Sequence, residues 1–508
     1  MDHPARPSGA TSGDDLSALA WVHGELRRSL ENAHKALRRH LKESETIGGS
    51  DVDSVDPALL RGARMQIHQG VGALELVGLP TVADVLRSGE AAVQRLAARP
   101  ALVDAAAVES VERVSFAVLD FLARQLAGKP VSPVMLFPQY RAAQQLAAAD
   151  RIHPADLWPL DFQWHELPAE PAVAARASDD EARGAMEGLV LALMRSADRG
   201  MLEATSDFCA ELGAGAPQRH EAALWRIAAA VFQAQAAGAL AADVYSKRLA
   251  SRLLAQLRLA VRGQHEVSER LAQDLLFFCA HAASAPGVAP RLDAVRRAWQ
   301  LDRHPTADYE TPRLGRFDPA AVALARKRVA GAREAWSTVA AGELHRIAAL
   351  GEPFALVGES LARLLPNGQT LAQALQGAAA QTAASGQAPA PPLAMEVATA
   401  ILYLDASIED GELEHPQLGA RVQRLAQRID EARSGGTTHP LEPWMEELYR
   451  RVSDRQTMGS VVQELRATLS EIERQVDQYF RQPSERQVLA AVPGQLGTMR
   501  GVLSVLGL

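Results

Sequence analysis

The apolar residues of this 508-residue chain recur three and four positions apart over most of its length. This spacing places them on one face of an α-helix, where they can pack against a neighbouring helix. Ala and Leu dominate the composition, and both lose little side-chain entropy in a helix. Runs of Val, Ile and Thr with a period of two, which indicate strands, are almost absent. The pattern predicts an all-α fold.

Charge and cysteine content exclude several classes of protein. The chain has 61 acidic and 53 basic residues, a formal net charge of -8, which argues against a nucleic-acid partner. Its two cysteines, Cys209 and Cys279, exclude a disulfide scaffold. The first residues lack the basic and apolar regions of a signal peptide, and the charge-free stretch at 227–242 is too short to span a bilayer. We therefore expect a cytoplasmic protein without membrane insertion.

The first part of the chain predicts a four-helix bundle over residues 14–130. Residues 1–13 are rich in Pro, Gly and Ser, and we expect them to be disordered. Amphipathic helical patterns follow at roughly 15–42, 56–79, 80–98 and 103–127. The last pattern ends at Gly128-Lys129-Pro130, a typical helix stop. The short connections favour an antiparallel arrangement.

The remaining segments differ in composition. We expect an aromatic- and proline-rich strap at 131–173, a helical middle domain at 174–383, a linker at 384–392, a helical segment at 393–433, a second linker at 434–443 and a last helical segment at 444–508. The strap concentrates aromatic residues such as Phe137 and Trp158 in a chain that is only 5% aromatic. Because aromatic side chains bury large areas, we expect the strap to pack against the bundle.

The second predicted helix carries a distinctive motif. It reads His68-Gln69-Gly70-Val71-Gly72-Ala73-Leu74-Glu75-Leu76-Val77-Gly78-Leu79 and resembles the phosphoacceptor helix of histidine phosphotransfer (Hpt) domains. In that family an outward-facing imidazole meets the aspartate of a receiver domain, and a glycine one turn later leaves room for docking. The resemblance implies that His68 is a possible phosphoacceptor. It also implies a partner-docking surface that we assign to Arg64, Gln69, Gly72 and Gly78.

One position departs from the Hpt pattern. The family places Lys or Arg where this chain has Val71, and a cation there stabilises the phosphoryl oxygens. Arg64 lies one turn before His68 on the same helical face and is a candidate substitute. Two interpretations of His68 stay open: a phosphotransfer residue, and an exposed histidine without chemistry.

The end of the chain repeats the pattern in degenerate form. Aligned without gaps, residues 497–508 place Gly501 on Gly72 and keep a basic residue at Arg500, but Gly497 replaces the histidine. This second site, formed by Gly497, Arg500 and Gly501, cannot carry a histidyl phosphate. Segment 444–508 is thus predicted to be a partial Hpt-like unit, which implies a truncation or pairing with another chain.

Longer stretches also resemble a known family. Residues 135–159, 274–280 and 313–337 are similar to FimL scaffold proteins, and equally to the N-terminal region of ChpA/PilL-type hybrid histidine kinases. Residues 442–480 resemble the segment before the second Hpt-like unit of those kinases. The resemblance implies a place in the chemotaxis-like two-component pathway that governs type IV pili and twitching motility. It implies scaffolding at least as much as phosphotransfer.

Three functional hypotheses follow. The first is a scaffold that docks a response-regulator receiver domain or polar scaffold proteins, with possible recruitment to the cell pole. The second is an active phosphotransfer protein that uses His68. The third is the regulatory front part of a hybrid kinase. The sequence contains no Walker motif and no Gly-x-Gly-x-x-Gly, and Cys279 with His281 lacks further metal ligands, so we expect no ATP site, cofactor or metal.

Overall fold

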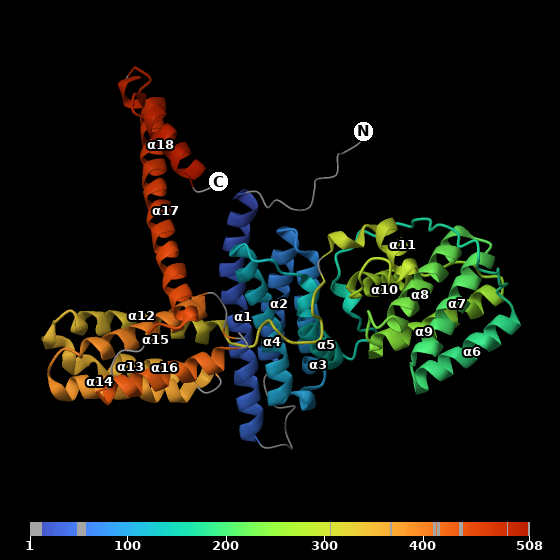
Figure 1. Ribbon diagram of the computed structural model, residues 1–508, viewed down its shortest axis with the longest axis horizontal. Coiled ribbons are helices and arrows are strands. Elements are labelled where there is room, and N and C mark those ends of the chain that lie inside the picture. Colours follow the sequence, from blue (N-terminus) through green and yellow to red (C-terminus); the bar gives the residue numbers. More distant parts are fainter. Residues whose placement is uncertain are drawn as a thin grey trace. The chain divides into compact units, whose positions relative to one another are not determined.

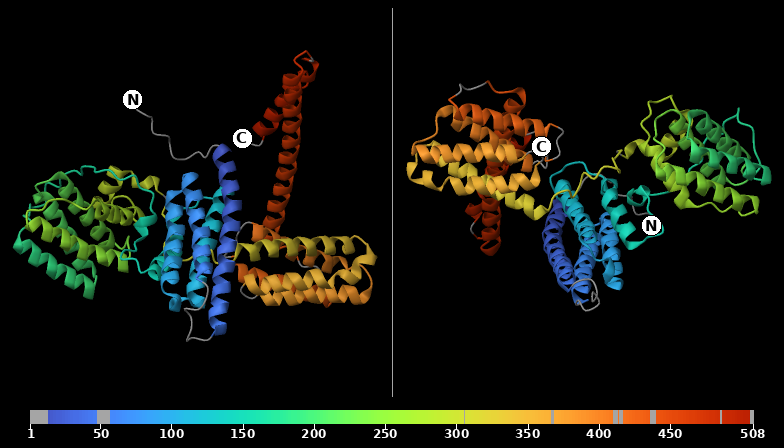
Figure 2. Two further views of the ribbon diagram at one scale, coloured as in Figure 1. Left: turned by 180° about the vertical axis from the view of Figure 1, so that it is seen from behind. Right: turned by 90° about the horizontal axis from the view of Figure 1, so that it is seen from below.

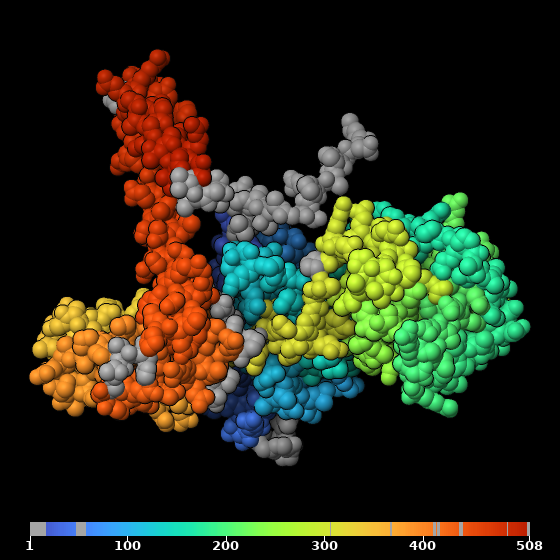
Figure 3. All heavy atoms as spheres, viewed as in Figure 1, coloured from blue at the N-terminus to red at the C-terminus, as the bar shows by residue number. Residues whose placement is uncertain are grey.

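The computed structural model describes residues 13–47, 57–304, 306–365, 368–409, 413, 417–435, 440–484 and 486–505. These residues form helices and connecting segments without any strand, which confirms the predicted all-α class (Figure 1). Side chains fill the space between neighbouring helices (Figure 3). The chain separates into two compact units, Met1–Pro319 and Ala320–Leu508. The boundary lies inside the segment 174–383, so that segment contributes to both units.

The N-terminal bundle consists of α1 (Gly13–Ile47), α2 (Ala58–Leu76), α3 (Pro80–Ala98) and α4 (Ala105–Leu126). Helix α1 packs on α2 and α4, and α3 packs on α2 and α4. The apolar stripe of α1, from Leu19 to Leu37, is buried in the core as its spacing predicts. The Asp104 side chain caps α4 by accepting a hydrogen bond from the Ala107 amide. Residues 1–12 lie outside the described residues, and Gly13 already belongs to α1.

The segment predicted as a strap has two parts with different partners. Its first part contains η3 (Pro133–Leu136) and α5 (Phe137–Ala147), and α5 packs on α3 and α4 of the bundle. Its second part contains η4 (Pro154–Leu157), whose neighbour Trp158 lies edge-on to Phe277, with ring centroids 5.8 Å apart. The strap therefore contacts the helices that follow it as well as the bundle.

The helices after the strap form a second group within the first unit. They are α6 (Asp180–Arg195), α7 (Arg199–Gly215), α8 (Arg219–Ala236), α9 (Val244–Val261), α10 (Glu269–His281) and α11 (Pro290–Trp299). Helix α8 lies at the centre and contacts α7, α10 and α11. Its Trp225 and Phe232 are buried, as are Phe277 and Phe278 of α10. Asp179, Asp198, Asp243 and Ser268 cap four of these helices at their N-termini.

After α11 the chain returns to the bundle. The Gln139 side-chain amide donates a 2.6 Å hydrogen bond to the Leu314 carbonyl, which joins α5 to this returning segment. Gly315 follows in a left-handed conformation, with φ of 67°. A Cβ atom at this position would lie 2.4 Å from the Ala117 nitrogen of α4. Only glycine satisfies both conditions, because it tolerates positive φ and has no side chain.

The second unit contains α12 (Pro319–Ala340), α13 (Gly351–Leu364), α14 (Gly368–Ser385), α15 (Pro391–Glu409), α16 (Leu418–Arg433), α17 (Pro443–Arg481) and α18 (Val492–Val505). Helix α14 packs on α13 and α16, and α15 packs on α16 and on α17. The predicted linker 384–392 is a short break between α14 and α15. Part of the second linker, residues 436–439, lies outside the described residues.

The buried side chain of His34 should make the stability of the N-terminal bundle sensitive to acid. Its ring is buried on α1 with its edge against Phe116, and its Nε2 has no hydrogen-bond partner among the described residues. Burial lowers the pKa of His34 from 6.5 to about 4, despite the nearby Glu112 carboxylate. Between these two values the unfolded chain binds a proton that the folded bundle does not, so stability falls as the pH drops through this window.

The loss from His34 amounts to about 3 kcal/mol at pH 4. Hydrogen exchange of the α1 amides measures it, because exchange reports local stability. We expect protection to fall between pH 6.5 and pH 4, and to fall less in a His34→Leu variant. Equal losses in the two proteins would contradict a role for His34.

Candidate functional site

His68 stands on the outer face of α2. Its side chain is 65% exposed, and its Nδ1 lies 3.1 Å from Glu90 Oε2 on α3. The Glu90 side chain is largely buried, so its carboxylate is held in place beside the imidazole. A carboxylate accepts hydrogen bonds, so this contact favours the tautomer with the proton on Nδ1. The lone pair of Nε2 is then available to a partner.

Exposed apolar side chains lie on either side of His68 along α2. Met65, His68, Gly72 and Leu76 follow one another at helical spacing on α2, with Gln69 at the edge of the stripe. We call these five residues the α2 face. Met65 is 51% exposed and Leu76 is 89% exposed, and a Cβ atom at Gly72 would meet nothing within 4 Å. The face thus combines an accessible imidazole with uncovered apolar side chains and free space above a glycine.

The other predicted residues of this helix occupy different environments. Arg64 is half-buried one turn before His68, and Gln69 is exposed. Gly78 has φ of 75° directly after α2, where its amide donates to the Glu75 carbonyl, so it ends the helix. Val71 is only 4% exposed and packs into the bundle core. Its position therefore faces away from solvent, where a phosphate-binding cation could not act.

The roles of two residues in this region could not be predicted from the sequence. Glu90 lies 22 positions after His68 on another helix, and no motif connects the two. Gly70 lies where α1 and α2 approach closely, since a Cβ atom there would lie 2.5 Å from Leu26 Cδ1. The alternation Gly70-Val71-Gly72 could have signalled one packed and one open glycine, because the two residues lie on different faces of the helix.

The predicted degenerate site lies on α18. Gly497, Arg500 and Gly501 are all exposed there, and Cβ atoms at the two glycines would meet nothing within 4 Å. Gly507 and Leu508, which complete the sequence repeat, lie outside the described residues. Helix α18 belongs to the second unit, where it packs on α17.

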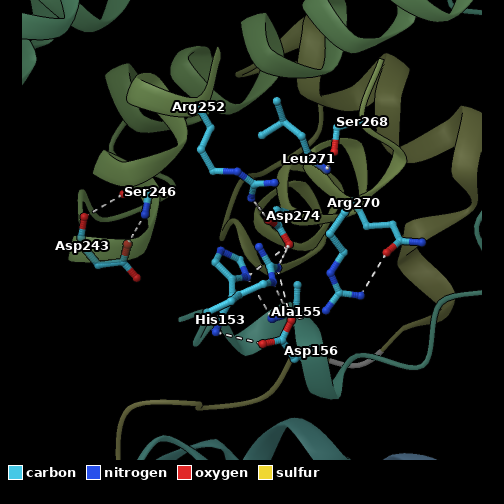
Figure 4. A network of polar contacts seen from close by, with 12 residues as sticks. His153, Ala155, Asp156, Asp243, Ser246, Arg252, Ser268, Arg270, Leu271 and Asp274 are labelled. Atoms are coloured by element: carbon cyan, nitrogen blue, oxygen red, sulfur yellow. Dashed lines mark hydrogen bonds and ion pairs between the residues drawn. The ribbon is translucent and has the colours of Figure 1, made fainter. Parts of the chain in front are cut away.

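A second polar cluster joins the strap to α9 and α10 (Figure 4). Asp274 on α10 is fully buried, and its carboxylate accepts hydrogen bonds from Arg151 of the strap, at 2.7 Å, and from Arg252 of α9. A buried carboxylate is tolerated only when charged donors surround it. The only trace of these contacts in the sequence is an acidic residue, Asp274, directly before the apolar run at 275–280.

Asp156 organises the strap end of the cluster. Its carboxylate accepts a 3.0 Å hydrogen bond from the His153 amide and contacts the guanidinium groups of Arg151 and Arg270. The His153 Nδ1 in turn accepts a 3.1 Å hydrogen bond from the Ala155 amide, which completes a capping box at η4. The cluster thus fixes the backbone of η4 against α10.

His153 is neutral in this cluster. Burial lowers its pKa to about 4, although Asp274 acts in the opposite direction. Its Nδ1 lies 3.4 Å from the Asp274 carboxylate, but this nitrogen already accepts the Ala155 amide proton. The two arginines, rather than the imidazole, therefore balance the charge of Asp274. The arrangement is that of a structural clamp.

The cysteines and His281 belong to the core. Cys209 and Cys279 are buried, and burial raises the pKa of each thiol to about 12. The His281 ring stacks on Phe277 with centroids 4.1 Å apart. Within the described ranges, His, Cys, Asp and Glu side chains form no group of three that could hold a metal ion. No described helix is long and apolar enough to cross a membrane.

Comparison with known proteins identifies a family for part of the chain. Residues 171–311 match the model of the family described as FimL scaffold protein second domain. The matched range contains α6 to α11 and includes Asp274, Arg252 and Arg270 of the clamp. No curated protein and no solved structure matches the chain. The helical part of the chain at 171–311 is therefore similar to the second domain of FimL scaffold proteins, which supports a FimL-like scaffold.

Proposed function

We propose that this protein is a scaffold of a chemotaxis-like two-component pathway that controls type IV pili and twitching motility. In this proposal the α2 face docks the receiver domain of a response regulator, and other surfaces hold polar scaffold proteins. The family match at 171–311 supports the scaffold role. The pathway and the partner rest on the sequence resemblance of the rest of the chain.

The observation that carries the docking proposal is the exposure of the α2 face. Leu76 and Met65 flank His68 and Gly72 on a rigid bundle helix, and both apolar side chains stand in solvent. Exposed apolar side chains that cluster on a rigid element are typical of protein interfaces. The open space above Gly72 lets a partner approach the helix backbone closely.

Binding of a purified receiver domain from the same pathway tests this proposal. A Gly72→Gln variant fills the open space with an uncharged side chain, and we expect it to weaken binding about tenfold or more. Calorimetric titration measures the dissociation constant.

Gly62→Gln is the matched control for this experiment. Gly62 lies on the same helix, is exposed and has equally open surroundings, but it lies ten positions, about 15 Å, before Gly72 and is not one of the five residues of the α2 face. Glutamine favours the helix over glycine at both positions, so neither change should unfold α2. Equal affinities of the two variants, or no binding by the natural chain, would overturn receiver docking on the α2 face.

The contact between His68 and Glu90 favours a second candidate function, phosphotransfer. In this reaction the Nε2 lone pair attacks the phosphorus of a receiver aspartyl phosphate. A nitrogen–phosphorus bond forms while the bond from phosphorus to the aspartyl oxygen breaks. The receiver, which supplies the Mg²⁺, is left with a free aspartate carboxylate. The imidazole keeps its Nδ1 proton and gains positive charge, which the Glu90 carboxylate stabilises.

Transfer of label from a phosphorylated receiver distinguishes the two candidates. A phosphotransfer protein acquires acid-labile label that disappears in a His68→Gln variant and decreases in Glu90→Gln. If the receiver binds but transfers no label, only the scaffold function is supported. The Glu90→Gln variant keeps the size of the side chain, so a decrease reports the lost charge rather than a change in packing.

A further inference from the structure

The long helix α17 has an apolar stripe that this unit only partly covers. Its first turns are anchored by the buried Met445 and Leu448, which lie in the part of the helix that faces α15. Beyond them, apolar residues alternate at steps of four and three, the heptad spacing of helices that pack along their length. These residues are Met458, Val462, Leu465, Leu469, Ile472, Val476 and Tyr479.

Helix α18 covers one side of this stripe. It folds back along the end of α17 (Figure 2), and Ile472 is buried in the pair. Four large apolar side chains remain in solvent on the adjoining side: Met458 at 42%, Val462 at 40%, Leu469 at 43% and Phe480 at 74% exposure. On α18, Leu496 and Leu503 are exposed as well. A hairpin of two helices with apolar surface on both is half of a four-helix bundle.

The uncovered side of α17 is symmetric about Leu469. Met458 lies 11 residues before it and Phe480 11 residues after it, while Val462 lies 7 before and Val476 7 after. If a second α17 packs antiparallel with Leu469 at a two-fold axis, Met458 meets Phe480 of the partner and Val462 meets Val476. Met458, Val462, Leu469 and Val476 of the stripe then each find an apolar partner, as a two-fold interface requires.

Two opposite charges flank this side of α17 at nearly equal distances from Leu469. Arg466 lies 3 residues before Leu469 and Glu473 lies 4 after it. Neither side chain forms an ion pair within the described part of the chain. The antiparallel arrangement brings Arg466 next to Glu473 of the partner, twice per dimer. A parallel arrangement in register would instead bring the two Arg466 side chains toward each other, which is unfavourable.

We propose that the occupant of this face is a second copy of the same chain. The two α17 helices pack antiparallel across Leu469, and the two α18 helices complete a dimeric four-helix bundle. This contact uses neither the α2 face nor the segment at 171–311, so it is independent of the proposed function. A dimer would give a scaffold two α2 faces and thereby increase its avidity for clustered partners.

Sedimentation analysis of the full chain tests the proposal first. We expect a dimer whose dissociation constant rises about tenfold or more with Leu469→Glu, because this places two carboxylates at the apolar centre of the contact. Ala467→Glu is the control, since residue 467 is exposed on the opposite side of the same helix. Arg466→Glu should weaken the dimer, and adding Glu473→Arg to that variant should restore it.

Disulfide cross-linking then tests the direction of the helices. The two natural cysteines are buried, so an introduced thiol reacts alone. Leu469→Cys should cross-link to itself across the axis. Val462→Cys should cross-link only when Val476→Cys is present in the same chain. A monomeric natural chain, or efficient cross-linking of Val462→Cys alone, would overturn the antiparallel dimer.

Discussion

A Glu396→Ala variant is expected to lose about 3–5 kcal/mol of stability in the second unit, the cost of breaking a buried ion pair by removing one partner. Glu396 on α15 accepts two hydrogen bonds from the Arg428 guanidinium on α16, at 2.8 and 2.7 Å. The Arg428 side chain is only 1% exposed and the Glu396 side chain 6%. Without Glu396, the permanently charged guanidinium keeps a 3.0 Å bond to the Pro440 carbonyl but loses the carboxylate that pairs with it.

Hydrogen exchange of α15 and α16 under increasing urea measures this loss. The double variant Glu396→Ala with Arg428→Met should recover much of it, because it removes the buried guanidinium together with its partner. Glu447→Ala breaks an exposed pair with Arg450 and should change stability by less than about 1 kcal/mol. A loss in Glu396→Ala no larger than in Glu447→Ala would contradict the assignment.

An Asp274→Ala variant is expected to release the strap from α10, with a loss of about 3 kcal/mol or more. The fully buried carboxylate holds Arg151 and Arg252 together, and Arg151 belongs to the strap. In the variant these two guanidinium groups repel each other, because the carboxylate between them is missing. Arg151 is a cleavage site for trypsin once it becomes accessible, so limited trypsin digestion reports the release.

Asp274→Asn separates charge from packing in this experiment. The amide keeps the size of the side chain and one acceptor oxygen but loses the negative charge, so we expect an intermediate effect. Glu203→Ala, which removes an exposed pair with Arg199, should leave digestion at Arg151 unchanged. Unchanged digestion in Asp274→Ala would show that the clamp does not hold the strap.

The sequence predicts local structure well because helical periodicity is a local property. The stripe from Leu19 to Leu37 predicted α1, and the position of Gly78 predicted the end of α2. The same reasoning placed His68 on a helix and Gly72 one turn later. Contacts between distant segments leave no such pattern, which is why Glu90 and the partners of Asp274 were not predictable.

Val71 illustrates this limit at the candidate site. An ungapped comparison with Hpt helices marks its position for a cation near His68, and Arg64 as the nearest replacement. In the folded bundle Val71 packs into the core, because α1 and α3 cover that side of α2. Which side of a helix is covered depends on its neighbours, and a single sequence does not report them.

In the first unit the chain leaves the bundle after α5, forms α6 to α11 and then returns to the bundle, where the Gln139–Leu314 hydrogen bond holds it. The two residues are 175 positions apart, so the α6–α11 group is an insertion whose two ends both attach to the same bundle. Bringing together two residues so far apart in the chain costs more chain entropy than forming a contact within either group of helices. We therefore expect the returning segment around Gly315 to be the last part of this unit to fold, and the first to detach under mechanical load.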